Sequence, residues 1–508
     1  MNFIEFIKNK VIVIICIASF LSALIYNEVN LNQIPTEHIR VGETIVTNDD
    51  ISYLVPPKNY LEKGEWKAND VGKQAYFIRP PGYGIFYGFF LKIAGFPLAL
   101  KLLKITQLLL FAVSIYWLYF IALTFLNCKK WAIITATIYG LTPFSIGFLY
   151  YTLTEGITPS LLILFIFLLT KASQHKTNKT IFYVLAAFSF AFLVLVRPQL
   201  VFFGILIPFF LLKDYWIISI QKTIMKSALL LLIGFSFYGA WQYRNYKITN
   251  KWLPPHPIYY NDGNSFFRPP LKAYWNFVGG WAQEGATAYS YMVPMWKAAI
   301  KGDTSITYIN NALATFPTKV NEYFTKERLI NTFRDYQSTV LYQKPYFEKE
   351  LPMPNALSKI ESKTITEFNE LTSEFKSHFC FDYYIKSPLK VFKLMAFHSN
   401  LSLYIFQLTY RGNWLMEIIR YLCFGLHSLL FLIMLVNLFN LKKMHLLFYG
   451  INAVVFIYVF YLCYFQRGIE ERYTLPILPL LLIGFTLFSQ QFVNRLKRFF
   501  DSVALRSE

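Results

Sequence analysis

Two adjacent acidic residues and a nearby arginine are the residues of this 508-residue chain best suited to chemistry. Asp49 and Asp50 lie in a short polar segment after the first long apolar run, and Arg79 follows before the next one. Neighbouring side chains in a loop point in different directions, so one carboxylate could act as a general base while the other binds. The alternative is an acidic turn that only solvates an outer loop.

The arginine is part of a distinctive segment, Arg79-Pro80-Pro81-Gly82-Tyr83. Proline restricts the residue before it to extended conformations, and Gly82 permits the backbone to turn toward the membrane. A guanidinium held in this way suits the oxygens of a phosphate, by charge and by its planar fork. The alternative is an arginine that only anchors the start of a helix at the membrane surface.

Glu155 is an acid in an otherwise apolar neighbourhood. A continuous helix from Lys130 would rise roughly 38 Å to Glu155, at about 1.5 Å per residue, which places this carboxylate at the outer end of the membrane. A carboxylate there is costly and is functional by default, unless the headgroups solvate it. It could bind an amine, a sugar hydroxyl or a divalent cation. The alternative is a structural role, in which its negative charge interacts favourably with the dipole at the start of the helix that follows.

Three more arginines occur where the chain turns between apolar runs: Arg197 before Pro198, Arg244 before Asn245, and Arg472 before Tyr473. Taken singly, such an arginine is more often a membrane anchor than a ligand. Together with Arg79, they predict a cationic collar for a lipid phosphate or diphosphate.

The elements that position these residues are predicted to be membrane helices. The chain is 55% hydrophobic and only 15% charged, whereas about a quarter of a soluble domain is charged. The first apolar run ends without an Ala-x-Ala site, so we expect a retained helix rather than a signal peptide. Apolar runs of roughly membrane-spanning length occur at 11–26, 99–126, 131–150, 155–171, 180–196, 198–213, 227–244, 415–439, 444–464 and 473–490. The prediction is an all-α polytopic membrane protein with about ten transmembrane helices, within a range of roughly nine to thirteen.

The net charge of +20 comes largely from Lys and Arg in short loops between these runs. Such loops face the cytoplasm, so we expect a multi-pass protein of the inner or plasma membrane with both termini cytoplasmic. This placement argues against nucleic-acid binding. The candidate acids and arginines then all fall in the loops of the opposite, extracytoplasmic side, which favours a single site there.

Motifs for other kinds of chemistry do not stand out. The five cysteines have no zinc-ligand or disulfide spacing, and neither a glycine-rich phosphate loop nor a Gly-x-Ser-x-Gly elbow occurs. A sugar nucleotide would need a cytoplasmic site, for which the predicted cytoplasmic loops are too short. No cofactor is required by the sequence, and a divalent cation is left open.

The chain divides into three predicted parts. Residues 1–245 form an N-terminal transmembrane catalytic module that includes the first outer loop, 27–98, in which Gly82–Leu98 is a surface-lying or re-entrant helix. Residues 246–414 form a polar extracytoplasmic region, long enough for a small domain of its own. Its end, Pro388–Tyr410, is expected to be an amphipathic helix on the outer leaflet. Residues 415–508 are the C-terminal transmembrane helices.

The order of these parts resembles the polyprenyl-phosphate-sugar glycosyltransferases of the GT-C superfamily, which include dolichyl-phosphate-mannose protein mannosyltransferases and lipid A aminoarabinose transferases. The resemblance covers about residues 1–250 well and 415–490 loosely, and 250–414 matches no part of the family. The motifs that carry it are Asp49-Asp50-Ile51-Ser52-Tyr53, Leu61–Trp66, residues 79–83, Glu155, Arg197-Pro198, Arg244-Asn245-Tyr246 and Glu471-Arg472-Tyr473-x-Leu475-Pro476.

This resemblance implies a GT-C-like bundle that transfers a sugar from a polyprenyl-phosphate donor to an extracytoplasmic glycan, lipid or protein acceptor, with inversion. Asp49 is then the catalytic base, although the family often has Asp-Glu where this chain has Asp-Asp, and Asp50 is the second candidate. The implied phosphate ligands are Arg79, Arg197, Arg244 and Arg472, and the implied acceptor- or metal-supporting residues are Glu155, Tyr53 and Tyr83. A lipid-linked oligosaccharide polymerase or ligase, and a flippase or transporter, are the alternatives. Transporters typically hold their charges near the bilayer midplane instead.

Overall fold

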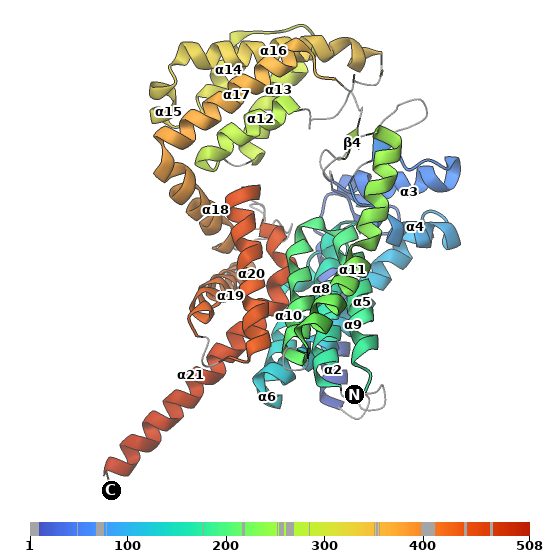
Figure 1. The fold of residues 1–508 in the computed structure, drawn as a ribbon, viewed down its shortest axis with the longest axis vertical. Helices are drawn as coiled ribbons and strands as arrows, with labels where there is room; N and C mark the ends of the chain where they lie inside the picture. Colours follow the sequence, from blue (N-terminus) through green and yellow to red (C-terminus); the bar gives the residue numbers. More distant parts are fainter. Residues whose placement is uncertain are drawn as a thin grey trace.

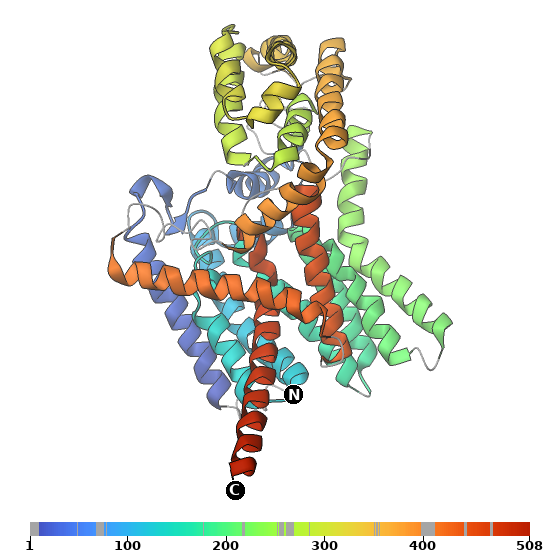
Figure 2. The same cartoon turned by 90° about the vertical axis from the view of Figure 1, so that its left-hand side faces the viewer.

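The structure is a computed structural model. It describes residues 10–47, 49–67, 76–77, 79–175, 177–215, 219–250, 252, 259–260, 269–283, 285–349, 351, 354, 356–397, 412–440, 444–467 and 471–507. A bundle of long apolar helices carries a separate group of shorter helices at one end (Figure 1). The start of the first bundle helix and the end of the last lie at the opposite end of the bundle (Figures 1 and 2). We call the end that carries the shorter helices the distal end.

The bundle confirms the predicted all-α polytopic membrane class. Seven segments of the described chain are long and apolar enough to cross a membrane. They are α2 (Lys10–Leu31), α5 (Leu98–Leu126), α9 (Lys179–Val196), α11 (Ile220–Thr249), α19 (Trp414–Leu438), α20 (Leu446–Tyr461) with its π-helical end η9 (Leu462–Gln466), and α21 (Leu478–Ser507) with the preceding 3₁₀ turn η10 (Glu471–Ile477). Shorter apolar helices are α8 (Thr158–Gln174) and the 3₁₀ segment η3 (Pro198–Ile205), which continues into α10 (Leu206–Tyr215).

One predicted helix is wrong in its extent. The run 131–150, and with it the expected climb from Lys130 to Glu155, is broken: α6 ends at Leu141, and α7 covers only Pro143–Ile146. A proline cannot continue the preceding helix, because it lacks an N–H and its ring excludes the helical conformation of the residue before it. Thr142 is accordingly extended. Glu155 therefore lies in a 3₁₀ turn, η2 (Thr154–Gly156), rather than on a long helix.

Helix α19 also departs from a simple picture of parallel spans. Its length and composition suit a membrane span, but Figure 2 shows it in dark orange, running strongly tilted across the direction of the other long helices. It packs mainly on α21 and α20. Of the predicted helix Pro388–Tyr410, α18 (Ser387–Ala396) is helical, and residues 398–411 lie outside the described residues.

The first outer loop is tied to the bundle by short pairings. The strands β1 (Ile39–Arg40) and β2 (Thr44–Ile45) form a hairpin that follows the 3₁₀ turn η1 (Thr36–His38). The backbone N–H of Ile45 donates to the carbonyl of Tyr150 at 2.9 Å. Helix α3 (Ile51–Lys63) begins directly after the acid pair. Strand β3 (Tyr76–Phe77) pairs with β4 (Tyr259–Tyr260), which comes much later in the chain.

Helix α4 (Gly82–Ala94) follows the Arg-Pro-Pro-Gly-Tyr segment and extends sideways from the distal end of the bundle (Figure 1). Its first residue needs to be glycine because of close packing: a Cβ on Gly82 would lie 2.6 Å from the carbonyl carbon of Leu195 at the end of α9. This contact brings the turn at Arg79 next to the chain that carries Arg197.

The shorter helices at the distal end surround a second hydrophobic core, rich in aromatic side chains such as Tyr274, Phe277, Phe333 and Phe368. We call them the outer helical region. They are α12 (Pro269–Val278), the 3₁₀ turn η4 (Gly279–Trp281), α13 (Gly285–Ile300), α14 (Ile306–Leu313), α15 (Thr318–Tyr323), α16 (Lys326–Glu348) and α17 (Lys359–His378). The π-helical turn η5 (Asp382–Lys386) and α18 connect this region to the bundle.

Candidate active site

Asp49 contacts an arginine from the opposite end of the chain. Its Oδ2 accepts a hydrogen bond from Nη2 of Arg472 at 2.7 Å, and 43% of the Asp49 side chain is exposed. Asp49 lies in the turn before α3, and Arg472 lies in η10, just before α21. The pair therefore joins the first outer loop to the last membrane helix at the distal end, with the carboxylate accessible to another molecule.

Glu155 and Arg197 form a buried ion pair behind this contact. Nη1 of Arg197 lies 3.0 Å from Oε1 of Glu155, and about 5% of each side chain is exposed. Nε of Arg472 is 3.9 Å from the same carboxylate oxygen. Asp49, Arg472, Glu155 and Arg197 thus alternate in charge from the surface inward. We call these four residues the rim cluster.

The protonation of Glu155 reflects its two guanidinium neighbours. Burial by itself would raise the pKa of this carboxyl, but the charge of Arg197 and, second, that of Arg472 bring its pKa below the ordinary value. Glu155 is therefore ionised at neutral pH and neutralises Arg197. The guanidinium of Arg197 also lies over the ring of Tyr473, 5.1 Å from its centroid.

Asp50 has a different environment from its neighbour. It is fully buried, and its Oδ2 lies 2.9 Å from Nη1 of Arg40 and accepts a hydrogen bond from Oγ1 of Thr152 at 2.9 Å. The same oxygen accepts the backbone N–H of Thr47 at 3.1 Å. We call Asp50, Arg40 and Thr152 the buried cluster. It ties the β1–β2 hairpin to the chain just before Glu155.

Arg79 lies beside the first turn of α3. Its Nη1 donates to the hydroxyl of Tyr53 at 3.1 Å and, more weakly, to Oγ of Ser52 at 3.5 Å. Ser52 in turn donates to the backbone carbonyl of Asp49 at 2.6 Å. Arg79 and Tyr53 are therefore linked to the acid pair through one serine.

Tyr83 packs edge-on against Tyr53, with ring centroids 5.4 Å apart. Its hydroxyl donates to Oε1 of Gln107 at 2.8 Å, and Nε2 of Gln107 donates to the carbonyl of Leu149 at 2.7 Å. Gln107 also touches the backbone near Glu155, because a Cβ on Gly156 would lie 2.5 Å from its Oε1. Tyr83 is thus part of the wall between α4, α5 and the loop of Glu155.

Arg244, the fourth predicted phosphate ligand, lies near the end of α11 beside the Leu61–Trp66 segment. Its Nη2 donates to the carbonyl of Trp66 at 3.1 Å, and its guanidinium lies 4.5 Å from the ring centroid of Trp241. These contacts place Arg244 with the aromatic residues next to α3. The ion pairs that connect the four residues of the rim cluster do not include it.

The structure thus brings together residues that are far apart in the sequence, as the single-site hypothesis requires. Asp49, Glu155, Arg197 and Arg472 are directly connected. Tyr53 and Tyr83 lie on the adjoining first turns of α3 and α4, and Arg79 lies just before α4 and bonds to Tyr53. Arg40 and Gln107 were not among the predicted site residues. Arg40 could have been found from its charge in the same polar loop as Asp49 and Asp50. Gln107 was harder to find, because its only mark in the sequence is a polar side chain within an apolar helix.

A divalent cation does not fit this arrangement. No three side chains of His, Cys, Asp or Glu lie together as a ligand set in the part of the chain that the structure describes. Oδ2 of Asp49, Oδ2 of Asp50 and Oε1 of Glu155 instead contact arginines, whereas Oδ1 of Asp50 is buried without a hydrogen-bond partner among the described residues. The three oxygens that contact arginines are arranged for guanidinium partners rather than for a metal ion.

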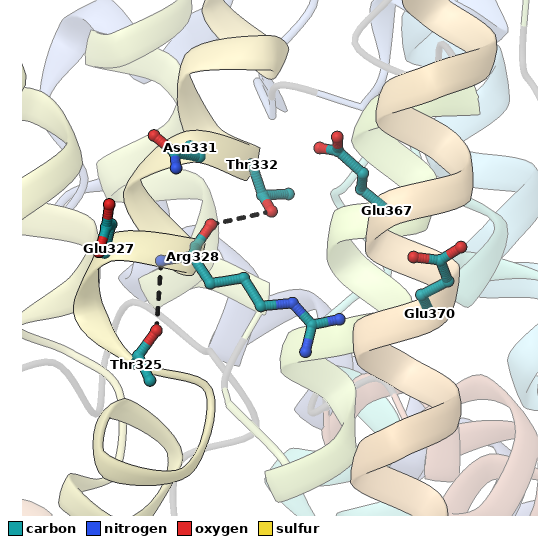
Figure 3. A pocket seen from close by; sticks show the side chains of 7 residues that line it. All are labelled: Thr325, Glu327, Arg328, Asn331, Thr332, Glu367 and Glu370. Carbon is teal, nitrogen blue, oxygen red and sulfur yellow. Dashed lines mark hydrogen bonds between the residues drawn. The ribbon is translucent and has the colours of Figure 1, made fainter.

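A cavity of about 380 Å³ lies in the outer helical region, between the start of α16 and α17 (Figure 3). Figure 3 shows Arg328 reaching from α16 toward α17. Its guanidinium forms a two-bond ion pair with Glu374 of α17, which the figure does not draw, at 2.8 and 2.6 Å. The cavity is lined by Thr325, Glu327, Arg328, Asn331, Thr332, Glu367 and Glu370. None of these is a predicted site residue.

Comparison with known proteins gives likenesses of low identity and low TM-score. No family model and no curated protein matches this chain. Among solved structures, the chain is similar to ArnT from Cupriavidus metallidurans bound to undecaprenyl phosphate, at 12% identity and a TM-score of 0.34, over 93% of this chain and 76% of ArnT. It is also similar to the archaeal oligosaccharyltransferase AglB from Archaeoglobus fulgidus, in complex with an inhibitory peptide and a dolichol-phosphate. That likeness has 11% identity and a TM-score of 0.41, over 96% of this chain and 52% of AglB.

Proposed function

We propose that this protein is an integral membrane glycosyltransferase that moves a sugar from a polyprenyl-phosphate donor to an acceptor on the extracytoplasmic side. The observation that carries the proposal is the half-exposed carboxylate of Asp49 beside Arg472 at the distal end of a membrane bundle. A general base and an anion-binding cation at a membrane surface are what the transfer of a lipid-linked sugar needs. The motifs of residues 1–250 that resemble the GT-C superfamily support the same reaction.

The donor phosphate competes with Asp49 for Arg472 in this proposal. Nη2 of Arg472 lies 2.7 Å from Oδ2 of Asp49. An arriving phosphate offers the guanidinium a second anionic partner, and a shift of Arg472 toward it leaves the carboxylate of Asp49 free to accept a proton. Arg79 is linked to Asp49 through Ser52, and in this proposal its guanidinium contacts the same phosphate. The charge of Arg197 is already neutralised by Glu155, so its role is to hold Glu155 and Tyr473.

The proposed reaction is one inverting displacement. The acceptor hydroxyl or amine loses its proton to Asp49 as its oxygen or nitrogen forms a bond to the anomeric carbon. The bond from that carbon to the phosphate oxygen breaks on the opposite face, and polyprenyl phosphate leaves with the electron pair. Arg472 and Arg79 stabilise the charge that develops on the phosphate. Arg244 and Trp66 are proposed to bind the donor at the far side of α3, and Tyr53 and Tyr83 to support the acceptor.

The test compares cells that lack this protein with cells that carry it. Restoring the unsubstituted protein should restore a sugar-sized mass on an extracytoplasmic glycolipid, glycan or glycoprotein, as measured by mass spectrometry. Asp49→Asn should not restore it, although the variant inserts in the membrane at the same level. Glu62→Gln, an exposed carboxylate of α3, is the matched control and should behave as the unsubstituted protein. No mass difference between deleted and restored cells would refute the proposed transfer.

A further inference from the structure

Arg467 occupies the junction between the bundle and the outer helical region. It follows η9 at the distal end of α20 and adopts a left-handed backbone conformation, with a φ of 49°. Figure 1 shows this end of α20 beside α18. The left-handed conformation of Arg467 ends the helix, and its N–H closes the last turn by donating to the carbonyl of Leu462 at 2.9 Å.

The guanidinium of Arg467 donates to several segments at once. Nη1 donates to the carbonyl of Gly279 in η4 at 3.0 Å and to Oγ of Ser387 in α18 at 3.3 Å. Nη2 donates to the carbonyl of Tyr383 in η5 at 3.0 Å, and Nε donates to the backbone carbonyl of Tyr464 in η9 at 3.0 Å. The guanidinium also lies over the ring of Tyr383, 3.8 Å from its centroid. One side chain thus joins η4, η5 and α18 to the end of α20.

The chemistry of these contacts differs from that of a surface ion pair. Arg467 is half-buried, and the partners it has among the described residues are carbonyls, one hydroxyl and one aromatic ring. Arginine suits this arrangement because its fork has five donors in fixed directions, whereas lysine has three donors at one point. Loss of the side chain removes these hydrogen bonds, although the carbonyl of Gly279 keeps those from the N–H of Ala282 and from Oγ of Ser387, and this loss weakens the docking of the outer helical region.

The same residue lies close in sequence to the rim cluster. Arg472, which holds Asp49, is in η10, the next described element after Arg467. Residues 468–470 lie outside the described residues. A direct contact also connects the two: α18, which Arg467 holds through Ser387, packs against η10, which carries Arg472.

We infer that Arg467 is a positioning residue that fastens the outer helical region to the segment carrying Arg472, so that the docking of this region sets the position of Arg472 for the donor phosphate. The part of the inference that concerns the donor phosphate rests on the proposed function. It gives the outer helical region a role in donor binding.

The experiment uses full-length protein in lipid vesicles, with one spin label on Cys380, which is exposed, and one on Glu62→Cys of α3. The other four cysteines are replaced by alanine. Arg467→Ala should broaden the distance distribution between the labels, and Arg467→Lys should give an intermediate width. Arg328→Ala, which removes an arginine within the outer helical region, should leave it unchanged. In the same vesicles, Arg467→Ala should weaken the binding of undecaprenyl phosphate roughly three- to tenfold, as expected for a weakened hydrogen bond.

An unchanged distance distribution in Arg467→Ala overturns the inference. A broadened distribution with unchanged affinity for undecaprenyl phosphate also overturns it, because the link to Arg472 is then absent. If Arg467→Ala does not fold, Arg467→Lys decides by the same two measurements. If the unsubstituted protein does not bind undecaprenyl phosphate, the proposed function fails, and the spin-label comparison alone still decides whether Arg467 fastens the two parts.

Discussion

The rim cluster and the buried cluster begin at adjacent residues and differ in almost every physical respect. Asp49 of the rim cluster is 43% exposed and meets one arginine, whereas Asp50 of the buried cluster is sealed from solvent among Arg40, Thr152 and the N–H of Thr47. A carboxylate that must exchange a proton needs a path to its substrate. A carboxylate with three fixed donors and no exposure instead holds its neighbours in place. The comparison assigns the proposed chemistry to Asp49 and the support of the loop to Asp50.

The largest expected effect is the loss of transfer in Asp49→Asn. The amide keeps the size of the side chain but cannot accept the proton, so the rate should fall on the order of 10³-fold or more, within the range that general-base catalysis and its geometry supply. Transfer is measured in proteoliposomes, and the unfolding temperature should change little because the site is half exposed. An Asp49→Asn protein with undiminished activity would show that another group is the base.

Asp50→Ala should instead reduce stability. It leaves the guanidinium of Arg40 beside a buried void, and removing one partner of a buried pair typically costs about 3–5 kcal/mol. The expected readout is a lower unfolding temperature and a smaller amount of inserted protein. The double variant Asp50→Ala, Arg40→Met should recover part of this loss. Full stability of Asp50→Ala, with activity abolished, would give Asp50 a direct chemical role instead.

Glu155 and Arg197, the buried pair of the rim cluster, predict that the stability of the protein depends on pH. Burial opposes the charge of Glu155, but Arg197 and Arg472 bring its folded pKa below the ordinary 4.5. A depressed pKa contributes stability that is present above the unfolded value and is lost as the pH falls through the folded one. The unfolding temperature should therefore fall below about pH 4.5 more steeply in the unsubstituted protein than in the double variant Glu155→Gln, Arg197→Met. Parallel curves would contradict the pairing.

The smallest effect is expected for Arg79→Ala. Arg79 is linked to the acid pair through Ser52 and Tyr53, so it should add to donor binding without being needed for the base. Loss of one charge-assisted contact corresponds to about a tenfold weaker affinity for undecaprenyl phosphate, which a vesicle binding assay detects. Lys58→Ala, an exposed cation of α3, is the control. Unchanged affinity would identify Arg79 as a membrane anchor.

The predicted membrane helices follow from composition, because an apolar run of sufficient length must bury its backbone hydrogen bonds within itself to cross a bilayer. Each of the predicted apolar runs is helical in the structure, wholly or in part. The run 131–150 is not one continuous helix, and it shows the limit of this reasoning. Hydropathy did not detect the break at Pro143, although the proline itself was a signal.

The sequence by itself determined the class of the protein, the placement of its charges in loops, and the candidate residues of the site, since these depend on residue types and on their order. Only the tertiary structure decided which charges meet. Arg472 reaches Asp49 because α21 packs beside α6 and α8, and the loop of Asp50 is fixed by its contact with Tyr150 and Thr152. Such distances depend on how whole helices pack, and two neighbouring aspartates with the same local sequence can be separated into exposed and buried only by that packing.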